Sequence, residues 1–405
     1  MASVTLDRNI GLDDTATGTQ TSTVGEPTAA SNNNDVYVTG NWYASRSSDG
    51  GSSWTLVDPF TALPSAAGGF CCDQVALHDR NRGLWIWILQ YIEQGGSNVF
   101  RVAVSTGPGG PWTYWDFAPT DLNSAWAGNG WFDYPDAATT DNHLYITFNV
   151  FNTGGNWLSA VAVKIPLDEL ASGAALNYQF YVVTTNGSLR LSRGATSDMF
   201  LGSHNGQNPV RVFRWPDAQN SSMSHFDVSP AGWSSGAYSA PGPGGEWLTR
   251  TDSRITGAWV AGNHVGFLWT ASPSGSRPRP YVKAAVIDAS SQSIVAEPDI
   301  WHDQVAWAYP AACPNGSGQV GVTLFFGGGP SNPTHVVGFL DGNAWAVAAT
   351  AASTNGPTGG KWGDYLSCEV HDGEGGEWVA SGYTLQGGND RSAVEPRYVL
   401  FSPGP

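Results

Sequence analysis

The sequence predicts an all-β protein, a seven-bladed β-propeller with four antiparallel strands in each blade. Two observations carry this prediction: strand-like runs dominate while helical patterns are nearly absent, and one segment pattern recurs seven times. Each recurrence reads as a short loop, a strand of small residues, a tight turn and an aromatic strand. The landmarks lie 46 to 62 residues apart, and known propeller repeats take roughly 40–50 residues. The landmark residues are Pro27, Asp73, Pro135, Gly194, Thr256, Pro310 and Tyr365.

The strand-like runs, such as residues 84–89 and 321–326, are short and rich in β-branched or aromatic residues. Gly, Asn, Asp or Pro bounds each of them. Residues 166–170 form the one helix-like stretch. Small residues on the first strand of each repeat suit an innermost position around a channel, and the bulky second strand suits packing between blades. We therefore expect residues 1–405 to form a single propeller domain.

The last repeat supplies only three strands, at residues 365–370, 377–383 and 397–401. A closed ring needs a fourth strand in that blade. Residues 4–8 can supply it from the other end of the chain. Pairing of the two terminal segments would remove the exposed sheet edges and hold the ring shut.

Composition excludes two classes of partner. The chain has 18 basic and 34 acidic residues, for a net charge of −16. Nucleic-acid binding draws most of its affinity from neutralising phosphates, and anionic membranes likewise attract basic patches. No apolar run reaches the 18 residues of a membrane helix. We expect neither a nucleic acid nor a membrane as partner.

The compartment is predicted from short signals. The first seven residues lack the basic and apolar regions of a signal peptide, which fits either a cytosolic start or a mature secreted chain. Asn-x-Ser sequons at Asn186, Asn220 and Asn315 favour secretion, so we expect an extracellular protein.

The four cysteines have no zinc-site spacing. Cys71 and Cys72 are adjacent in sequence, and either a vicinal disulfide or two free thiols fits them. Cys313 and Cys368 lie six residues after a tryptophan in neighbouring repeats, so they should be neighbours, as two thiols or as a bridge.

The ligand site is expected at one end of the channel. In a propeller, each first strand begins at one face and each second strand ends there, so side chains at both places line one funnel. The strand map gives this funnel a polar and aromatic lining, typical of a ligand site. The substrate-binding candidates are Asn41, Trp42, Asp73, Gln74, Tyr134, Asp136, Tyr309 and Tyr365.

Arginine is scarce, so its placement is informative. Arg193 and Arg254 fall at the funnel on adjacent blades, with Arg190 beside Arg193. A guanidinium near a channel is costly to bury unless it meets an anion. Two interpretations stay open: an internal ion pair, or a fork for a substrate carboxylate. The internal partners within reach would be Glu26, Asp73, Asp136 or Asp364.

His204 falls at a second-strand end, before the turn formed by Asn205 and Gly206. A neutral imidazole near pH 7 can take or give a proton, so His204 is the expected proton-transfer residue, together with a funnel tyrosine such as Tyr91. The alternative is a hydrogen-bonded histidine that only orients its loop.

One motif is specific. Residues 47–54 read Ser-Ser-Asp-Gly-Gly-Ser-Ser-Trp and match the pattern Ser-x-Asp-x-Gly-x-x-Trp of the Asp-box hairpin in sialidase-like propellers. A second copy, with Gly in place of the Asp, spans residues 105–112. The Asp side chain of such a turn bonds the backbone of its own turn, so Asp49 is expected to be structural.

The chain resembles secreted seven-bladed propellers that act on acidic polysaccharides. The resemblance rests on the Asp box, the seven-fold period and two segments, 39–42 (Thr-Gly-Asn-Trp) and 69–74 (Gly-Phe-Cys-Cys-Asp-Gln). The chain resembles L-rhamnose-α-1,4-D-glucuronate lyases in particular. Sialidases are less similar, because their Arg-Ile-Pro segment is missing and only Arg254-Ile255-Thr256 stands near it.

This resemblance implies a monomeric polysaccharide lyase that cleaves an acidic oligo- or polysaccharide by β-elimination at a uronate. That reaction needs a group that neutralises the carboxylate, a base and an acid. We expect Arg193 and Arg254 in the first role, and His204 and Tyr91 in proton transfer. No cofactor or metal is required, and a bound calcium ion is compatible with such a protein. The alternatives are an exo-glycoside hydrolase, which would need two carboxylates, and a sugar-binding lectin.

Overall fold

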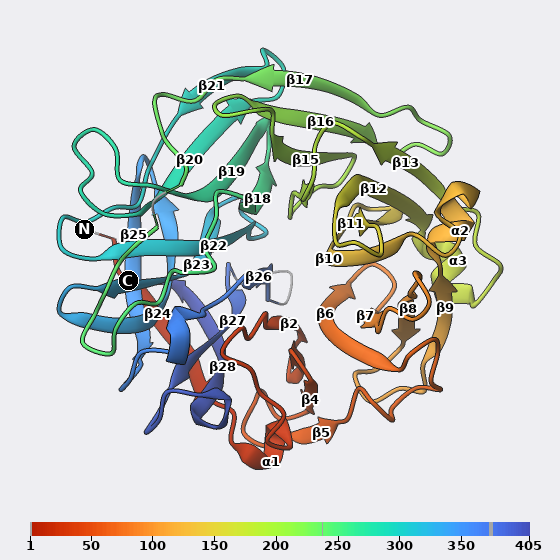
Figure 1. Cartoon of the computed structure of the whole chain (residues 1–405), viewed down its shortest axis with the longest axis horizontal. Helices are drawn as coiled ribbons and strands as arrows, with labels where there is room; N and C mark the ends of the chain where they lie inside the picture. Colours follow the sequence, from red (N-terminus) through yellow and green to blue (C-terminus); the bar gives the residue numbers. More distant parts are fainter. Residues whose placement is uncertain (1, 237, 372–375) are drawn as a thin grey trace.

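The computed structural model describes residues 2–236, 238–371 and 376–405, and within them the strands form seven four-stranded antiparallel sheets arranged in a ring (Figure 1). The predicted all-β, seven-bladed propeller is thereby confirmed. Blades 1 to 4, each from its innermost strand outwards, are β2 (Thr28–Asn32), β3 (Asp35–Gly40), β4 (Tyr43–Ser47) and β5 (Thr55–Val57); β6 (Phe70–Asp79), β7 (Leu84–Tyr91), β8 (Phe100–Ser105) and β9 (Thr113–Phe117); β10 (Trp131–Thr139), β11 (His143–Phe151), β12 (Trp157–Pro166) and β13 (Gln179–Val183); β14 (Arg190–Leu191), β15 (Asp198–His204), β16 (Val210–Pro216) and β17 (Ser224–Val228).

The last three blades follow the same order. They are β18 (Ile255–Ala261), β19 (His264–Ala271), β20 (Tyr281–Asp288) and β21 (Ser293–Ala296); β22 (Ala306–Pro314), β23 (Val320–Gly328), β24 (Ser331–Asp341) and β25 (Ala344–Ala352); β26 (Ser367–Val370), β27 (Trp378–Leu385), β28 (Val394–Pro403) and β1 (Val4–Gly11).

Helices are short and lie in the connections between strands. They are α1 (Asp14–Thr17), α2 (Pro119–Leu122), α3 (Leu167–Ser172) and the 3-10 turns η1 (Ser124–Trp126), η2 (Thr358–Gly360) and η3 (Arg391–Ala393). The helix expected near residues 166–170 is α3, which ends at Gly173 with a left-handed φ of 69°. Within the described residues, no helix has the length and apolar character needed to cross a membrane.

The ring is closed by the two ends of the chain, as predicted. Strand β1 pairs with β28 from Val4, opposite Pro403, to Gly11, opposite Arg397. The N and C labels accordingly lie near one another in Figure 1. The seventh blade therefore takes its outermost strand from the N-terminal segment, so neither end of the sheet series is left unpaired.

Tryptophan side chains fill the seams between neighbouring blades. Trp112 packs against Tyr37 of β3 and Trp87 of β7, with ring centroids 5.8 and 5.4 Å away, so it joins blades 1 and 2. Trp54 packs against Tyr398 of β28 at 5.8 Å and joins blades 1 and 7. The two tryptophans of the sequence motif therefore occupy equivalent seams, where each buries a large apolar surface.

The turn before Trp54 is held by Asp49. One oxygen of Asp49 accepts hydrogen bonds from the Ser53 amide at 2.8 Å and the Ser47 hydroxyl at 2.7 Å, and the other accepts from the Ser53 hydroxyl at 2.6 Å. These bonds favour the ionised carboxylate and lower the pKa of Asp49 to about 2. Asp49 thus stabilises its own turn.

The structure resolves the alternatives left open for the cysteines. Cys71 and Cys72 form a vicinal disulfide, whereas Cys313 and Cys368 are buried free thiols on β22 and β26. Burial raises the pKa of both thiols well above the ordinary value, which keeps them protonated.

Two of the three sequons are inaccessible. Asn186 and Asn315 are buried, and their side-chain amides donate to the carbonyl oxygens of His204 and Gly376. Asn220 is exposed. Glycosylation of the folded protein is therefore confined to Asn220 among these sites.

Candidate functional site

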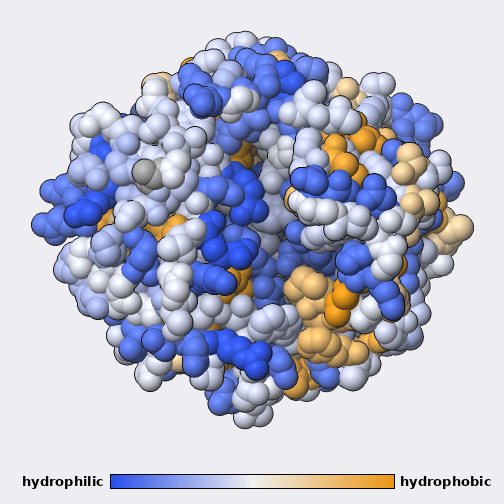
Figure 2. Space-filling view, in the orientation of Figure 1, coloured by the Kyte–Doolittle hydropathy of each residue, from blue (hydrophilic) through white to orange (hydrophobic). Residues whose placement is uncertain are grey.

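The face drawn in Figure 2 is hollowed near the centre of the ring, and hydrophilic residues gather around the hollow. Three blades present a residue to the funnel through an unusual backbone conformation. Glu26, Tyr134 and Tyr309 have φ values of 45°, 59° and 58°, and each directly precedes a proline at the start of a blade. The pairing of β10 with β11 and of β22 with β23 slips at these positions in blades 3 and 6. Left-handed φ values are uncommon for residues other than glycine, and bulges re-aim side chains. This repeated left-handed conformation makes the funnel the candidate functional site.

Arg254 lies across the funnel mouth. Its guanidinium carbon sits 4.4 Å from the ring centre of Tyr134, its Nη2 is 3.1 Å from Asp364 Oδ1, and its Nε is 2.7 Å from Asp252 Oδ2. Arg250 binds the second oxygen of Asp364 at 2.8 Å. Arg250 and Arg254, which lie in the same connection between strands, therefore both bind the carboxylate of Asp364 from another blade. Arg250 and Arg254 both keep some exposure to solvent, at 42% and 27% of their side chains.

Several carboxyl side chains lie beside Arg250 and Arg254, and these carboxyl groups outnumber the two arginines. Burial first, then the charges of Asp73 and Asp364, raise the pKa of Glu26 well above its ordinary value. Burial and Asp133 raise the pKa of Asp73 to about 7, and Glu26 and Asp73 hydrogen-bond to one another. Two carboxyls this close cannot both ionise without a large cost, so the pair holds a proton at neutral pH.

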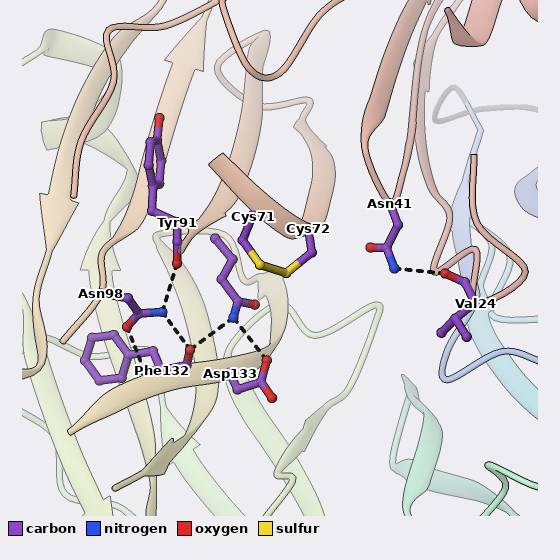
Figure 3. Close-up of a disulfide and its surroundings, with 9 residues drawn as sticks. Val24, Asn41, Cys71, Cys72, Tyr91, Asn98, Phe132 and Asp133 are labelled. Carbon is purple, nitrogen blue, oxygen red and sulfur yellow. Dashed lines mark hydrogen bonds between the residues drawn. A yellow bond between two sulfur atoms is a disulfide. The ribbon is translucent and has the colours of Figure 1, made fainter. Parts of the chain in front are cut away.

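Asp133 is the neighbouring carboxylate and differs from the Glu26–Asp73 pair. Gln90 donates to its Oδ1 at 3.0 Å, and within the described residues it forms no ion pair (Figure 3). Burial raises the pKa of Asp133 as well. An aspartate with a raised pKa is, in its ionised form, a stronger base than an ordinary aspartate.

Tyr134 and Tyr365 meet edge to face on the floor of the funnel, with centroids 5.7 Å apart. Both hydroxyls are buried and have no hydrogen-bond partner among the residues the structure describes. Burial raises the pKa of both phenols, so they stay protonated. Buried polar groups of this kind are normally satisfied by water or a ligand, and these two can donate to a sugar oxygen.

The vicinal disulfide borders the same site. Figure 3 shows Cys71 and Cys72 between Asp133 on one side and Asn41 on the other. Asn41 donates to the Val24 carbonyl at 2.8 Å, and its proximity acts to lower the pKa of Glu26. Asn41, predicted to bind substrate, thus holds the strained segment that carries Glu26.

Trp42 and Tyr309 complete the expected rim. Trp42, in the turn from β3 to β4, has a φ of 78° and lies 5.8 Å from the guanidinium of Arg391. The hydroxyl of Tyr309 is hydrogen-bonded to that of Thr251, just before the segment that carries Asp252 and Arg254. Tyr309 is therefore buried beneath the arginine loop.

Arg193 is more deeply buried than Arg254, with 7% of its side chain exposed against 27%, and it has different carboxylate partners. Arg193 binds Asp136 at 2.9 Å and Glu369 at 2.6 Å, and Arg190 binds Asp136 at 3.4 Å. Burial acts to raise the pKa of Asp136, but the two arginines outweigh it and lower that pKa. This agrees with the internal ion-pair interpretation, although Glu369 was missed as a partner. Arg193 and Glu369 also border a cavity of about 240 Å³ lined by turns of the opposite face.

His204 lies outside the carboxyl cluster. Its Nε2 bonds the carbonyl oxygen of Ser253 at 2.7 Å, and its ring packs 4.7 Å from Trp233 and 5.1 Å from Trp269. Burial lowers the pKa of His204 to about 4, so the imidazole is neutral and its Nε2 donates the bond. The expected proton-transfer role is not supported by this geometry. The histidine instead fixes the backbone immediately before Arg254.

Gln74 and Tyr91 also lie away from the cluster. Gln74 is fully buried, donates to the carbonyls of Gly40 and Tyr43, and accepts from the indole of Trp87 at 2.8 Å, so it ties blade 2 to blade 1. The hydroxyl of Tyr91 accepts from Arg101 at 2.7 Å inside blade 2, and burial raises its pKa to about 12. The polar groups of Gln74 and Tyr91 are hydrogen-bonded inside or between blades, because their strands point these side chains into the blades and not into the funnel.

Sequence reasoning missed Asp133, Arg250 and Glu369. Asp133 directly precedes the Tyr134–Pro135 landmark, and this adjacency was an available signal. Arg250 belongs to a long connection for which the repeat gives no register. Within the described part of the chain, no group of three or more His, Cys, Asp or Glu side chains is arranged to hold a metal ion.

Comparisons with known proteins find only distant structural similarity. No family model and no curated protein matches the chain. Among solved structures, similarity is found to a subtype N10 neuraminidase-like protein of A/little yellow-shouldered bat/Guatemala (TM-score 0.44, 8% identity, 80% of this chain and 96% of that one). It is found also to the NanB sialidase of Streptococcus pneumoniae (0.44, 10%, 76% and 66%) and to the SapL1 lectin in complex with alpha methyl fucoside (0.44, 10%, 83% and 99%). Likenesses at these TM-scores and identities carry no conclusion about this chain. Its own sheet topology defines a seven-bladed β-propeller, and sialidases and lectins are among the solved structures similar to it.

Proposed function

We propose that this propeller is a carbohydrate-active enzyme that cleaves the glycosidic bond of an acidic saccharide in its central funnel, by β-elimination at a uronate. The observation that carries the proposal is the pairing of two arginines on one carboxylate, Asp364, beside the proton-sharing pair Glu26–Asp73. A substrate carboxylate can take the place of Asp364 on Arg250 and Arg254. It would then lie next to a carboxyl group able to give up a proton.

The geometry supports one assignment of roles. Arg250 and Arg254 neutralise the uronate carboxylate, which acidifies the C5 hydrogen and stabilises the charge that develops when it leaves. Asp133 takes the C5 proton. The Glu26–Asp73 pair gives its proton to the glycosidic oxygen on C4 as the C4–O bond breaks and a C4–C5 double bond forms. No oxidant, reductant or water is consumed.

Hydrolysis is the second candidate, favoured by the number of carboxyl groups. Glu26, Asp73, Asp133 and Asp364 surround one site, and glycoside hydrolysis needs a protonated and an ionised carboxyl group on either side of the bond. In this reaction the Glu26–Asp73 pair would again be the acid. An ionised neighbour would act as base or nucleophile.

An assay on polymers that contain rhamnosyl-glucuronate distinguishes these reactions. Elimination produces an unsaturated uronate that absorbs in the near ultraviolet, hydrolysis releases saturated reducing sugar, and a lectin would only shift in melting temperature. We expect the ultraviolet product from the wild type and at least a hundredfold loss of rate in Asp73→Asn and Arg254→Ala. Asp168→Asn, at a side chain on α3 that is 86% exposed, is the matched control and is expected to keep the wild-type turnover. Equal rates in the wild type and Arg254→Ala would overturn the proposal.

We also propose that the protein works outside the cell, as a monomer, on its saccharide partner. The Cys71–Cys72 disulfide supports this location, because disulfides persist in oxidising compartments. Mass spectrometry of the secreted and cytosolic forms would show whether the bond depends on the compartment.

A further inference from the structure

A groove of about 440 Å³ opens beside Arg254 on the funnel face, between blades 3 and 4. It is formed by the β11–β12 turn, the connection from β13 to β14, and the segment before β18. Its volume falls within the range of small-molecule sites. The lining residues are Asn149, Phe151, Trp157, Thr185, Gly187, Ser188, Asp252 and Arg254.

The indole of Trp157 is held in place while 37% of the residue stays exposed. Its Nε1 donates to Asn149 Oδ1 at 3.2 Å. The same oxygen accepts from the Ser188 amide at 2.8 Å, and the Asn149 amide donates to the Ser188 hydroxyl at 3.0 Å. Ser188 adopts a left-handed φ of 49° in this arrangement. One hydrogen bond thus holds the exposed aromatic ring, and two more fix its acceptor Asn149 to a loop residue with a left-handed φ, which is preorganisation of the kind that ligand sites show.

Gly187 allows the loop to approach the indole. A Cβ at this position would lie 3.0 Å from the Trp157 Nε1 and 3.3 Å from Asn149 Oδ1. Contacts that short force a neighbouring side chain to shift. Alanine at position 187 would therefore displace the ring without removing any polar group.

The charge of the groove is confined to one end. Asp252 binds Arg254 at 2.7 Å, so their charges offset one another, and the other lining side chains are uncharged. An uncharged ligand unit therefore suits the Trp157 end, and the Arg254 end suits an anionic unit that displaces Asp364 from the guanidinium.

We propose that the groove is a subsite for an uncharged pyranose unit, which stacks one face on Trp157 while the acidic sugar attached to it is held by Arg254. This inference rests on the proposed function for its acidic neighbour. The C–H groups on one face of a pyranose present an apolar surface to the ring, and the hydroxyls at its edge can reach Thr185 and Ser188.

The test is calorimetric titration with two probes, glucuronic acid and rhamnosyl-(1→4)-glucuronic acid, with Asp73→Asn present in every protein so that the probe is not consumed. Trp157→Ala should weaken binding of the disaccharide about tenfold and leave that of glucuronic acid unchanged. Gly187→Ala should act in the same direction. Trp301→Ala removes a tryptophan that is 46% exposed and lies outside the groove, and it should change neither affinity.

The outcomes separate the subsite from the proposed function. If Trp157→Ala leaves the disaccharide affinity unchanged, or weakens both probes alike, the subsite is overturned. If Arg254→Ala leaves both affinities unchanged while Trp157→Ala weakens the disaccharide, the subsite stands and the acidic contact of the proposed function fails. Absence of disaccharide binding to the Asp73→Asn parent overturns the subsite, and the activity of the wild type then decides the proposed function.

Discussion

Glu26 and Asp73 show how single residues carry the chemistry of the funnel. Each is buried, and each is accompanied by another carboxyl rather than by a basic group. A buried carboxyl pair of this kind opposes folding. One of the two groups cannot ionise in the folded protein, whereas both ionise freely in the unfolded chain. Proteins retain such unfavourable groups mainly where function uses them.

Asp73→Asn should therefore stabilise the protein at neutral pH. The pKa of Asp73 is about 7 in the folded state against 3.8 ordinarily, so the folded state binds more protons between these values, and the free energy of unfolding falls as pH rises from about 4 to 7. We expect the variant to gain about 2 kcal/mol at pH 8 and almost nothing at pH 4. Urea unfolding at both pH values measures this.

Asp303→Asn is the control for this prediction, since its side chain is 69% exposed. It should change stability little at either pH. A variant at position 73 that loses stability at pH 8 would contradict the raised pKa.

At the scale of elements, a chain of charged side chains links the innermost strands of blades 3, 4 and 7. Asp136 on β10, Arg193 directly after β14 and Glu369 on β26 form one buried ion-paired chain across the channel. Small residues on these strands leave a gap along the axis, and the long arginine side chain spans it. Because these ion pairs engage its guanidinium, Arg193 is not free to bind a substrate carboxylate.

Removing Arg193 should cost stability rather than binding. Arg193→Met leaves Asp136 with Arg190 as its remaining partner and leaves Glu369 buried without its ion pair, so we expect a loss of about 3–5 kcal/mol in the free energy of unfolding. Arg214→Met breaks the pair with Asp198, in which the arginine is 51% exposed, and should cost less than about 1 kcal/mol. Denaturant titration of the two variants compares them. Adding Glu369→Gln to Arg193→Met should recover part of the loss, and no recovery would contradict the ion-pair account.

At the scale of the whole molecule, the ring depends on the pairing of β1 with β28. This contact joins residues almost 400 positions apart, and it converts an open series of sheets into a closed one. Ile10 also reaches the seam between blades 7 and 1, where it packs with the cluster that contains Trp54.

Deleting residues 1–10 should lower the Tm by roughly 10 °C or more, because the seventh blade loses its outer strand and exposes β28. Differential scanning calorimetry measures the change. A shorter deletion of residues 1–3, which precede β1, is the control and should leave the Tm nearly unchanged. An unaltered Tm in the longer deletion would show that closure contributes little.

The sequence alone determined the architecture. The seven-fold recurrence, the terminal strand that completes blade 7 and the structural turn at Asp49 all follow from local signals: strand periodicity, turn residues and repeat spacing. The same signals indicated which segments meet at the funnel, and so predicted Tyr134, Asp73 and Arg254 in one site.

Only the tertiary structure decided which side chains share an environment. Gln74, Tyr91 and His204 lie at funnel positions in the strand map, yet each faces a blade wall or a loop, since pleat direction and bulges set where a side chain points. Arg250 joins the site from a connection without a repeat register, whereas Glu369 lies on a predicted inner strand and its pairing with Arg193 depends on where its side chain points. The proton shared by Glu26 and Asp73 depends on burial and separation, and these are properties of packed atoms in three dimensions rather than of residue order.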